Sequence, residues 1–285
     1  MSAGAPGGAV LHVWQGGELR PPSDGRDDEA DPRLLVADSW LVDDGRVLAL
    51  DVHRDRFTGS VAEALARPDV TTGPDAGEPA AFWAAAVAAL PRTGAWFPRV
   101  ELVAVDRPDG RPGGGGGARL QLRLRPAPPR RRSVVLATAD HDPRTRPTVK
   151  GPDLAALGAL VADARARGAD EAVLLSPEGH VVEGAWSSIV WWRGDALCLP
   201  ADDLPRLPGV TLRTLTTLAA VLGVDVLHDR TRPDELDGFE VWSLGALHGP
   251  RIVTGWVGGP SPAEEPGRLG LWRGRLDRLR RPIDA

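Results

Sequence analysis

The chain has 285 residues, of which 42% are hydrophobic and 26% charged, and its formal net charge is −5. These values are typical of a soluble globular protein and exclude wholesale disorder. The acidic balance argues against a nucleic-acid-binding protein. The longest apolar run, residues 80–90, is too short to span a bilayer, and no secretory signal pattern follows Met1. Cys198 is the single cysteine, so we expect no intrachain disulfide, no cysteine-based metal site and a cytoplasmic location.

The first half of the chain has the pattern of short strands with two helices. The polar, acidic residues 23–31 predict an exposed loop, and the glycine-rich residues 108–117 predict a hairpin loop rather than a phosphate-binding loop, because a strand follows them. The turn signal Asp43-Asp44-Gly45-Arg46 predicts a hairpin. Strands are expected at 10–14, 34–42, 47–50, 99–106, 118–125 and 133–138, and helices at 51–65 and 79–90.

The second half is more regular. A helix is expected from Gly151-Pro152-Asp153 to Gly168. Hairpins are expected at 172–183 and 188–199, a helix at 211–222, a strand at 224–228, a short helix or turn at 233–236, and strands at 239–244 and 252–256. The pattern predicts a mixed α/β protein with many antiparallel hairpins. We place a smaller N-terminal domain at 1–139 and a larger C-terminal domain at 140–285.

Lysine is almost absent from the sequence. Lysine and arginine together number 34, and Lys150 is the only lysine. Arginine stays protonated in proteins, whereas lysine can become neutral and act as a nucleophile or base. Lys150 precedes a helix start, where burial and the helix dipole favour the neutral amine. Chance persistence of an ordinary surface lysine is the alternative.

Two further features suggest an anionic ligand with a ring nitrogen. Glu183 is flanked by valines and followed by Trp186, and a carboxylate in such surroundings needs a partner. It could bind a cofactor's ring nitrogen, or it could be a solvated glutamate at a hairpin end. Leu207-Pro-Gly-Val210-Thr211 opens a helix whose first N–H groups could bind a phosphate. An ordinary N-cap by Thr211 is the alternative.

The order and spacing of these features resemble one family. The resemblance rests on Lys150, on 169–172 (ADEA), on Val182-Glu183-Gly-Ala-Trp-Ser-Ser188-Ile, on Leu207-Pro-Gly-Val-Thr211 and on residues 240–251 (EVWSLGALHGPR). In the first half, His53-Arg-Asp-Arg56-Phe57 is similar to the family's H-x-x-R element. Together they resemble the class IV pyridoxal-phosphate aminotransferases, which include branched-chain and D-amino-acid aminotransferases and 4-amino-4-deoxychorismate lyase. The resemblance covers about residues 34–260.

The resemblance implies a fold type IV pyridoxal-phosphate enzyme: two α/β domains with mixed, largely antiparallel sheets, usually a homodimer. It implies that Lys150 forms the Schiff base with pyridoxal 5'-phosphate and moves protons, and that Glu183 bonds the pyridine nitrogen. The residues implied to bind the cofactor and its phosphate are Arg56, Lys150, Glu183, Ser188, Val210, Thr211 and Ala246.

Several positions depart from the family's pattern. Ser187-Ser188 stands where Ser-Asn is frequent, Leu212 stands where an arginine is usual, and Ala246 replaces a phosphate-side hydroxyl. Residues 37–40 (ADSW) stand where a glycine-rich segment is usual, and the chain has no tyrosine.

These residues suggest three functions. Pro126-Ala-Pro-Pro and residues 246–251 resemble the lyase branch, so we expect release of pyruvate from 4-amino-4-deoxychorismate to give 4-aminobenzoate, a step of folate biosynthesis. A branched-chain or D-amino-acid aminotransferase is the first alternative. A non-catalytic binding or scaffold protein that keeps the fold is the second. If the protein is a lyase or an aminotransferase, we expect its partner to be a small amino substrate, and we expect neither a membrane nor nucleic acid to be involved.

Overall fold

The computed structural model describes residues 8–22, 33–105 and 116–283. Contacts within the chain divide it into two units. The first contains residues up to 128, residues 149–152 and the C-terminal residues from 280, and the second contains 129–148 and 153–279. The predicted boundary at 139–140 therefore falls inside the second unit. Lys150 groups with the first unit, although we expected it in the C-terminal domain.

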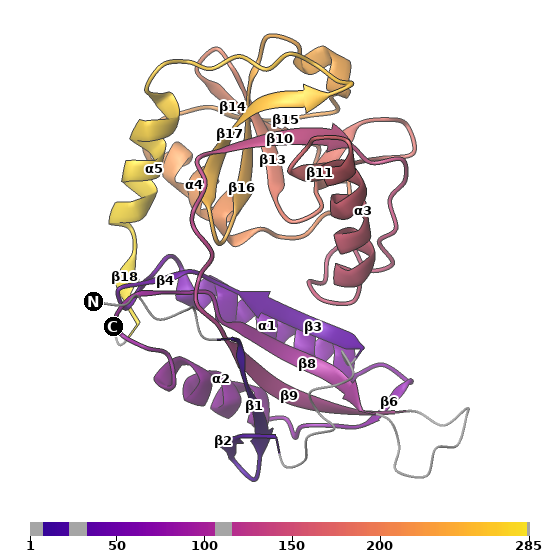
Figure 1. Ribbon diagram of the computed structural model, residues 1–285, viewed down its shortest axis with the longest axis vertical. Helices are drawn as coiled ribbons and strands as arrows, with labels where there is room; N and C mark the ends of the chain where they lie inside the picture. The colour runs from indigo at the N-terminus through magenta and orange to yellow at the C-terminus, as the bar shows by residue number, and fades with distance from the viewer. Residues whose placement is uncertain (1–7, 23–32, 106–115, 284–285) are drawn as a thin grey trace. The chain divides into compact units, whose positions relative to one another are not determined.

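The first unit contains a six-stranded sheet and two helices (Figure 1). The strand order is β2-β1-β9-β8-β3, and β6 pairs with β9. The strands are β1 (Val10–Gln15), β2 (Glu18–Arg20), β3 (Leu34–Ser39), β6 (Val70–Thr72), β8 (Arg99–Val105) and β9 (Gly116–Leu124), and the helices are α1 (Leu50–Leu65) and α2 (Glu78–Ala88). A small sheet follows the order β18 (Arg281–Pro282), β5 (Arg46–Val47), β4 (Val42–Asp43), β7 (Ala95–Trp96).

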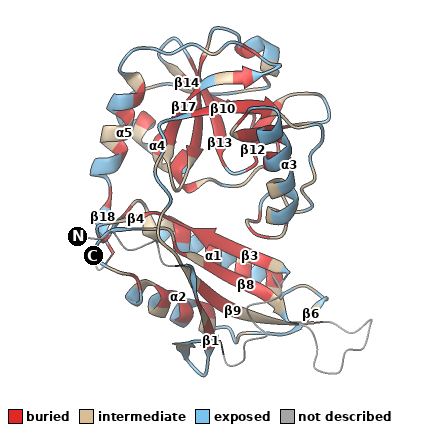
Figure 2. Ribbon diagram, viewed as in Figure 1, coloured by how far each residue is buried: buried red, intermediate tan, exposed pale blue. Residues whose placement is uncertain are grey.

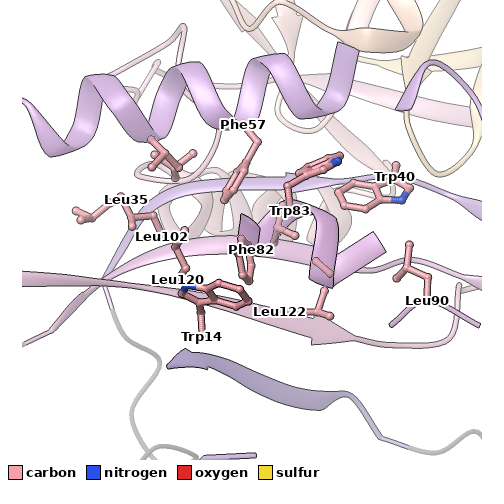
Figure 3. Packing of buried hydrophobic residues seen from close by; sticks show 14 of the residues in the cluster. Trp14, Leu35, Trp40, Phe57, Phe82, Trp83, Leu90, Leu102, Leu120 and Leu122 are labelled. Carbon is pink, nitrogen blue, oxygen red and sulfur yellow. The ribbon is translucent and has the colours of Figure 1, made fainter. Parts of the chain in front are cut away.

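The two helices of this unit cover one face of its main sheet with aromatic side chains (Figure 3). Phe57 of α1 lies 6.0 Å between ring centroids from both Phe82 and Trp83 of α2, and Trp14 of β1 meets Phe82 edge-on at 5.9 Å. The helix-side face of the strands is apolar, with Leu102 opposite Leu120 in the register of β8 and β9. Burial of such rings contributes about 1.5–3 kcal/mol each, so this layer holds the helices on the sheet.

The second unit contains an eight-stranded mixed sheet (Figure 1). Its order is β12-β11-β10-β17-β16-β13-β14-β15, in which β10–β11, β10–β17 and β14–β15 are parallel and the other pairs antiparallel. The strands are β10 (Ser133–Thr138), β11 (Glu171–Leu175), β12 (Val181–Gly184), β13 (Ser188–Arg193), β14 (Ala196–Pro200), β15 (Val226–Asp229), β16 (Glu240–Gly245) and β17 (Gly249–Val257). The helices are α3 (Leu154–Ala166), α4 (Val210–Val221), the 3-10 helix η1 (Pro233–Leu236) and α5 (Arg268–Arg278).

This sheet is buried on both faces, and its strands are largely buried in Figure 2. Leu215 of α4 and Trp272 of α5 pack in one cluster with Val190, Trp192 and Trp242 of the sheet. Side chains of alternate positions, such as Ile189 and Trp191, belong to a second cluster with η1. Strands buried on both faces are nearly continuous in apolar residues, which is why residues 188–192 lack alternation.

Most predicted elements are present, and the mixed α/β fold class is confirmed. The loop expected at 23–31 and most of the glycine-rich loop lie outside the described residues, while β8 and β9 form the predicted antiparallel pair. The elements β2, β6, β7, α5 and β18 were not predicted. No helix in the described ranges is both long and apolar enough to cross a membrane.

Candidate functional site

Lys150 is held at the edge of the first unit's sheet by its own backbone. The amide of Ala37 in β3 donates a hydrogen bond to the carbonyl oxygen of Lys150 at 2.7 Å. The next residue, Gly151, has φ +137°, and a Cβ built on it would lie 2.8 Å from backbone atoms of Val36 and Ala37. Only glycine fits such an approach. This contact explains why residues 149–152 group with the first unit and not with the helix that follows them.

Arg56, expected to bind a phosphate, forms a bidentate ion pair with Asp38. Its Nε and Nη2 lie 2.8 Å from the two carboxylate oxygens, and His53 Nδ1 lies 2.8 Å from Oδ1. Burial would raise the pKa of Asp38, but Arg56 and His53 together hold the pKa of that carboxyl well below its usual range. Burial lowers the pKa of His53, Asp38 opposes this, and the charges of Arg56 and Lys150 lower it further. The charge of Lys150 thus acts on this buried group.

Glu183 is a buried carboxylate in the second unit. It pairs with the guanidinium of Arg144, and both side chains are nearly inaccessible, at 8% and 4%. The amide of Leu207 lies 3.3 Å from each of its carboxylate oxygens. Burial would lower the pKa of Arg144, but Asp142 and Glu183 raise it above its usual value. Glu183 is therefore a fixed acceptor and not a solvated glutamate at a hairpin end.

The start of α4 forms a cradle beside Ser188. The helix begins after Gly209, which is extended and has no side chain with which to cap the helix. A Cβ on Gly209 would lie 2.6 Å from Ser188 Oγ, so the hydroxyl lies directly against this turn. Val210 and Thr211 are buried at the first two helical positions. N–H groups at a helix start favour a bound anion, and the N-cap residue Gly209 has no side chain that could form a capping hydrogen bond here.

Ala246 lies in the turn between β16 and β17, beside the end of β13 at which Ser188 lies. Ser188 is opposite Leu244 in the β13–β16 register. A Cβ on Gly245 would lie 3.7 Å from the carbonyl oxygen of Trp186. The second unit therefore brings Glu183, Ser188, residues 207–211 and the 245–246 turn into one neighbourhood.

A buried polar network supports the loop between Glu183 and Ser188. Glu171 accepts hydrogen bonds from the amide of Trp186 at 3.0 Å and from the hydroxyl of Ser187 at 2.7 Å. Arg251 donates to Glu171 at 2.5 Å and to Ser243 at 2.8 Å. Four chain segments are thereby joined behind the site. Because Glu171 is only 2% exposed, its ion pair with Arg251 and its hydrogen bonds to Trp186 and Ser187 tie this loop to the buried sheet.

Five of the expected residues, Glu183, Ser188, Val210, Thr211 and Ala246, lie in the second unit, and Lys150 and Arg56 lie in the first. The ionic partners that orient them were not predicted. Asp38 lies in segment 37–40, which departs from the family's pattern, and Arg144 lies in a proline-rich connector. No motif therefore marked either residue as an ionic partner. Glu171 and Arg251 belong to the quoted motifs, but nothing in those motifs indicates that the two residues pair.

The described residues of the two units, each taken by itself, offer three groups with distinct chemistry. One is the only lysine amine of the chain, which can add to a carbonyl when neutral. The second is a buried, ion-paired carboxylate that can accept a proton-bearing nitrogen. The third is a helix start open to a phosphate.

Known proteins share sequence and fold with this chain. A family model described as amino-transferase class IV matches residues 35–256. A branched-chain-amino-acid aminotransferase of Pseudomonas aeruginosa is 38% identical over 69 residues, which are 24% of this chain and 22% of that protein. A probable branched-chain-amino-acid aminotransferase of Rickettsia felis is 31% identical over 77 residues, 27% of this chain and 26% of that protein. The chain thus matches about a quarter of the length of these relatives.

Solved structures are similar over almost the whole chain. A hypothetical aminotransferase from Mycobacterium tuberculosis in its PLP-bound form has a TM-score of 0.72 at 20% identity, covering 95% of this chain and 98% of that one. A branched-chain aminotransferase from Thermoproteus uzoniensis has a TM-score of 0.75 at 18% identity, covering 97% and 100%. One from Thermobaculum terrenum in its PLP form has a TM-score of 0.75 at 18% identity, covering 96% and 98%. At these identities the likeness establishes the fold.

Proposed function

The chain belongs to the amino-transferase class IV family of pyridoxal-phosphate enzymes, and we propose that it acts on a small amino acid with pyridoxal 5'-phosphate bound at Lys150. The observation that carries the proposal is the Glu183 neighbourhood. The buried carboxylate of Glu183, paired with Arg144, lies beside a helix start that follows a glycine. A phosphorylated pyridine needs these two features at its two ends.

The residues present fit this cofactor. Gly209 places no side chain of its own over the first N–H groups of α4, and Ser188 Oγ lies against the same turn, so a phosphate there could meet both. Arg56 is the weaker part of the fit, because its guanidinium is already paired with Asp38. We propose that Val210, Thr211 and Ser188 make the main phosphate contacts, that the Ala246 turn lines the same side, and that Arg56 adds charge.

When bound, the cofactor supplies an electron sink for the carbon that loses a proton. The residues of this chain have separate roles. Lys150 provides the amine that holds the cofactor's aldehyde carbon and then moves the substrate proton. Glu183 keeps a proton at the pyridine nitrogen, and Arg144 keeps Glu183 in its anionic form and fixed orientation.

Two reactions are candidates for this site. The names of the curated relatives favour amino-group transfer, so an aminotransferase of an amino acid is the first proposal. Residues 126–129 (PAPP) and 246–251 (ALHGPR) favour the second, a lyase that releases pyruvate from 4-amino-4-deoxychorismate. A keto-acid acceptor is required for the first reaction and not for the second. A cytoplasmic homodimer remains a prediction for either.

The test begins with the absorbance spectrum of purified protein supplied with pyridoxal phosphate. Borohydride treatment followed by peptide mapping should place the cofactor on the peptide that contains Lys150. Glu183→Gln should keep cofactor binding but lower turnover by roughly two orders of magnitude, since a charge at the ring is lost. Glu178→Gln is the matched control, because Glu178 is an exposed turn residue bonded to Ser176. Lack of cofactor uptake at saturation would overturn the proposal.

A further inference from the structure

Arginine side chains from two segments far apart in sequence meet at the turn between β16 and β17. One segment is the connector that leads into β10, and the other is α5, which contacts β17 (Figure 1). A Cβ built on Gly249 would lie 3.7 Å from Nη2 of Arg130 and 3.9 Å from Nη1 of Arg273. Two guanidinium groups of the second unit therefore lie against the same point of the turn, at a residue that has no side chain.

A third guanidinium lies beside α5. A Cβ on Gly270 would lie 3.7 Å from Nη2 of Arg132, and Gly270 precedes Arg273 by three residues in the helix. Residues three apart are neighbours on a helix surface, so Arg132 and Arg273 lie along one side of α5. Arg132 is exposed, and its guanidinium forms no ion pair with the part of the chain that the structure describes. We call Arg130, Arg132 and Arg273 the arginine cluster.

Contacts within the unit hold two members of this cluster in position. Nη1 of Arg273 donates to the carbonyl oxygen of His248 at 2.8 Å and to that of Pro250. Carbonyl oxygens carry no net charge, so these bonds orient the guanidinium without cancelling its charge. Nη2 of Arg130 lies 3.4 Å from a carboxylate oxygen of Asp277, whose side chain is 46% exposed. An exposed pair of this kind is weak, so an incoming anion can compete with Asp277 for Arg130.

His248 responds to the positive charge at this turn. Burial, followed by the charges of four arginines, lowers its pKa from 6.5 to about 4, and these arginines are Arg251, Arg131, Arg130 and Arg273. Carboxylates nearby pair with individual arginines, namely Asp170 with Arg131, Glu171 with Arg251 and Asp277 with Arg130. The charges that act most strongly on His248 are nonetheless all positive. This turn therefore favours an anion over a further cation.

We propose that the arginine cluster binds a small dianionic oxyanion of the phosphate type, at a site separate from the start of α4. Guanidinium forks match the oxygen atoms of a phosphate in geometry and charge. Gly249 leaves space at the backbone of the turn, and a dianion compensates more positive charge than a single carboxylate does. None of the three arginines belongs to the residues expected to hold the cofactor, so the inference goes beyond the proposed function.

The hairpin connects this ion to the cofactor side of the unit. Gly249 is opposite Gly245 in the β16–β17 register, and Ala246 lies in the turn between them. An ion bound to both Arg130 and Arg273 joins the segment before β10, this turn and α5. The expected ligand is therefore an effector that stabilises the turn, and not a reactant.

The test is a calorimetric titration of the cofactor-loaded protein with sodium sulfate at about pH 7.5 and constant ionic strength. Sulfate is a dianion that mimics phosphate, and loading the cofactor first fills the phosphate site proposed at α4. We expect saturable binding with a Kd of about 1 mM or below, as two charge-assisted hydrogen bonds provide. Arg132→Gln should weaken binding about ten-fold, because it removes one such bond. Arg132 is exposed and has no ion pair among the described residues whose loss could damage the fold.

Two variants of α5 separate a specific site from general attraction to positive charge. Asp277→Asn removes the carboxylate that competes for Arg130, so sulfate binding should become about three-fold tighter. Arg275→Gln is the matched control: its guanidinium lies 5.3 Å from the ring centroid of Trp272, and a residue two positions after Arg273 does not share its helix face. This control removes the same charge from the same helix and should change the Kd by less than about two-fold.

Inorganic phosphate and glycerol 3-phosphate distinguish the source of the ligand. Similar affinity for both identifies a site open to phosphate monoesters, and binding of inorganic phosphate alone identifies free phosphate. Each result agrees with the inference. Ser188→Ala, at the α4 start, should leave the sulfate affinity unchanged.

Four outcomes would overturn the inference: no saturation at about 20 mM sulfate, unchanged affinity in Arg132→Gln, equal weakening in Arg132→Gln and Arg275→Gln, or weaker binding in Asp277→Asn. Loss of sulfate binding in Ser188→Ala would also overturn it, because the ion would then lie at the α4 start. Cofactor uptake is measured separately by absorbance. Failure of uptake contradicts the proposed function, and the sulfate titration of the same protein still tests the arginine cluster.

Discussion

Arg144 and Glu183 form an ion pair across 39 positions of sequence, with both side chains almost excluded from solvent. Asp142, two residues before Arg144, bonds the other side of the guanidinium. The connector that contains both residues therefore has a structural role in the site, although its polar and proline-rich composition suggests only a link. A buried charge without its partner is strongly destabilising, so this pair can be tested by removing one member.

Arg144→Met should lower the free energy of unfolding by about 3–5 kcal/mol, because it leaves the Glu183 carboxylate buried without its guanidinium. Urea unfolding followed by tryptophan fluorescence measures the change. Arg193→Met is the control: its pair with Asp229 is 49% and 40% exposed, and an exposed pair contributes less than about 1 kcal/mol. Equal, small losses in the two variants would mean that Glu183 is stabilised by other groups.

Gly151→Ala should disturb the position of Lys150. An alanine there would have to adopt φ +137° and place its Cβ 2.8 Å from the β3 backbone, which cannot move aside as a side chain can. We expect a loss of at least about 2 kcal/mol of stability and weaker cofactor uptake. Gly158→Ala, within α3 with open space around its Cβ, should instead stabilise by about 0.5–1 kcal/mol. A silent Gly151→Ala would contradict the tight contact with β3.

The fold followed from the sequence where local pattern and final packing agree. Residues 154–166 and 210–221 place apolar side chains at helical spacing, and both segments are helices. The helix near the C-terminus was not predicted. Leu269, Trp272 and Leu276 have the spacing of an amphipathic helix, but the arginines around them hide that stripe.

The site followed from the sequence only in part. Motif residues such as Glu183 and Thr211 were singled out as candidates because each lies near an end of a local element, and their roles remain predictions. Their ionic partners were not, since Asp38 and Arg56, or Glu171 and Arg251, come together only when distant strands and helices pack. The grouping of Lys150 with the first unit was not predicted for the same reason: it depends on the contact of residues 150 and 151 with β3, which sequence pattern does not encode.

Gly209→Ala should weaken cofactor binding without a large loss of stability. Its Cβ would lie 2.6 Å from Ser188 Oγ, so the serine side chain must turn away from the helix start. Ser188→Ala in the same chain removes the clash, and the double variant should bind pyridoxal phosphate more tightly than Gly209→Ala alone. Equilibrium titration by absorbance measures both. If the loss of binding in the double variant equals the sum of the losses in the two single variants, Ser188 and Gly209 act independently.

His248 should make the protein less stable as pH falls. Its Nδ1 accepts the amide N–H of Arg131 at 3.2 Å. Burial, followed by the charges of Arg251, Arg131, Arg130 and Arg273, lowers the pKa of His248 from 6.5 to about 4. Between these two values the unfolded chain binds the proton and the folded chain does not, so the free energy of unfolding must decrease as pH is lowered through this window.

His248→Gln removes this titration and keeps an acceptor for the Arg131 amide. We expect the variant to match the parent closely at about pH 7 and to lose less stability than the parent between about pH 7 and about pH 4.5. Urea unfolding at several pH values across this window measures both slopes. Parallel slopes for the two proteins would show that the imidazole takes up its proton equally in the folded and unfolded states, and that the arginines around the β16–β17 turn leave it unaffected.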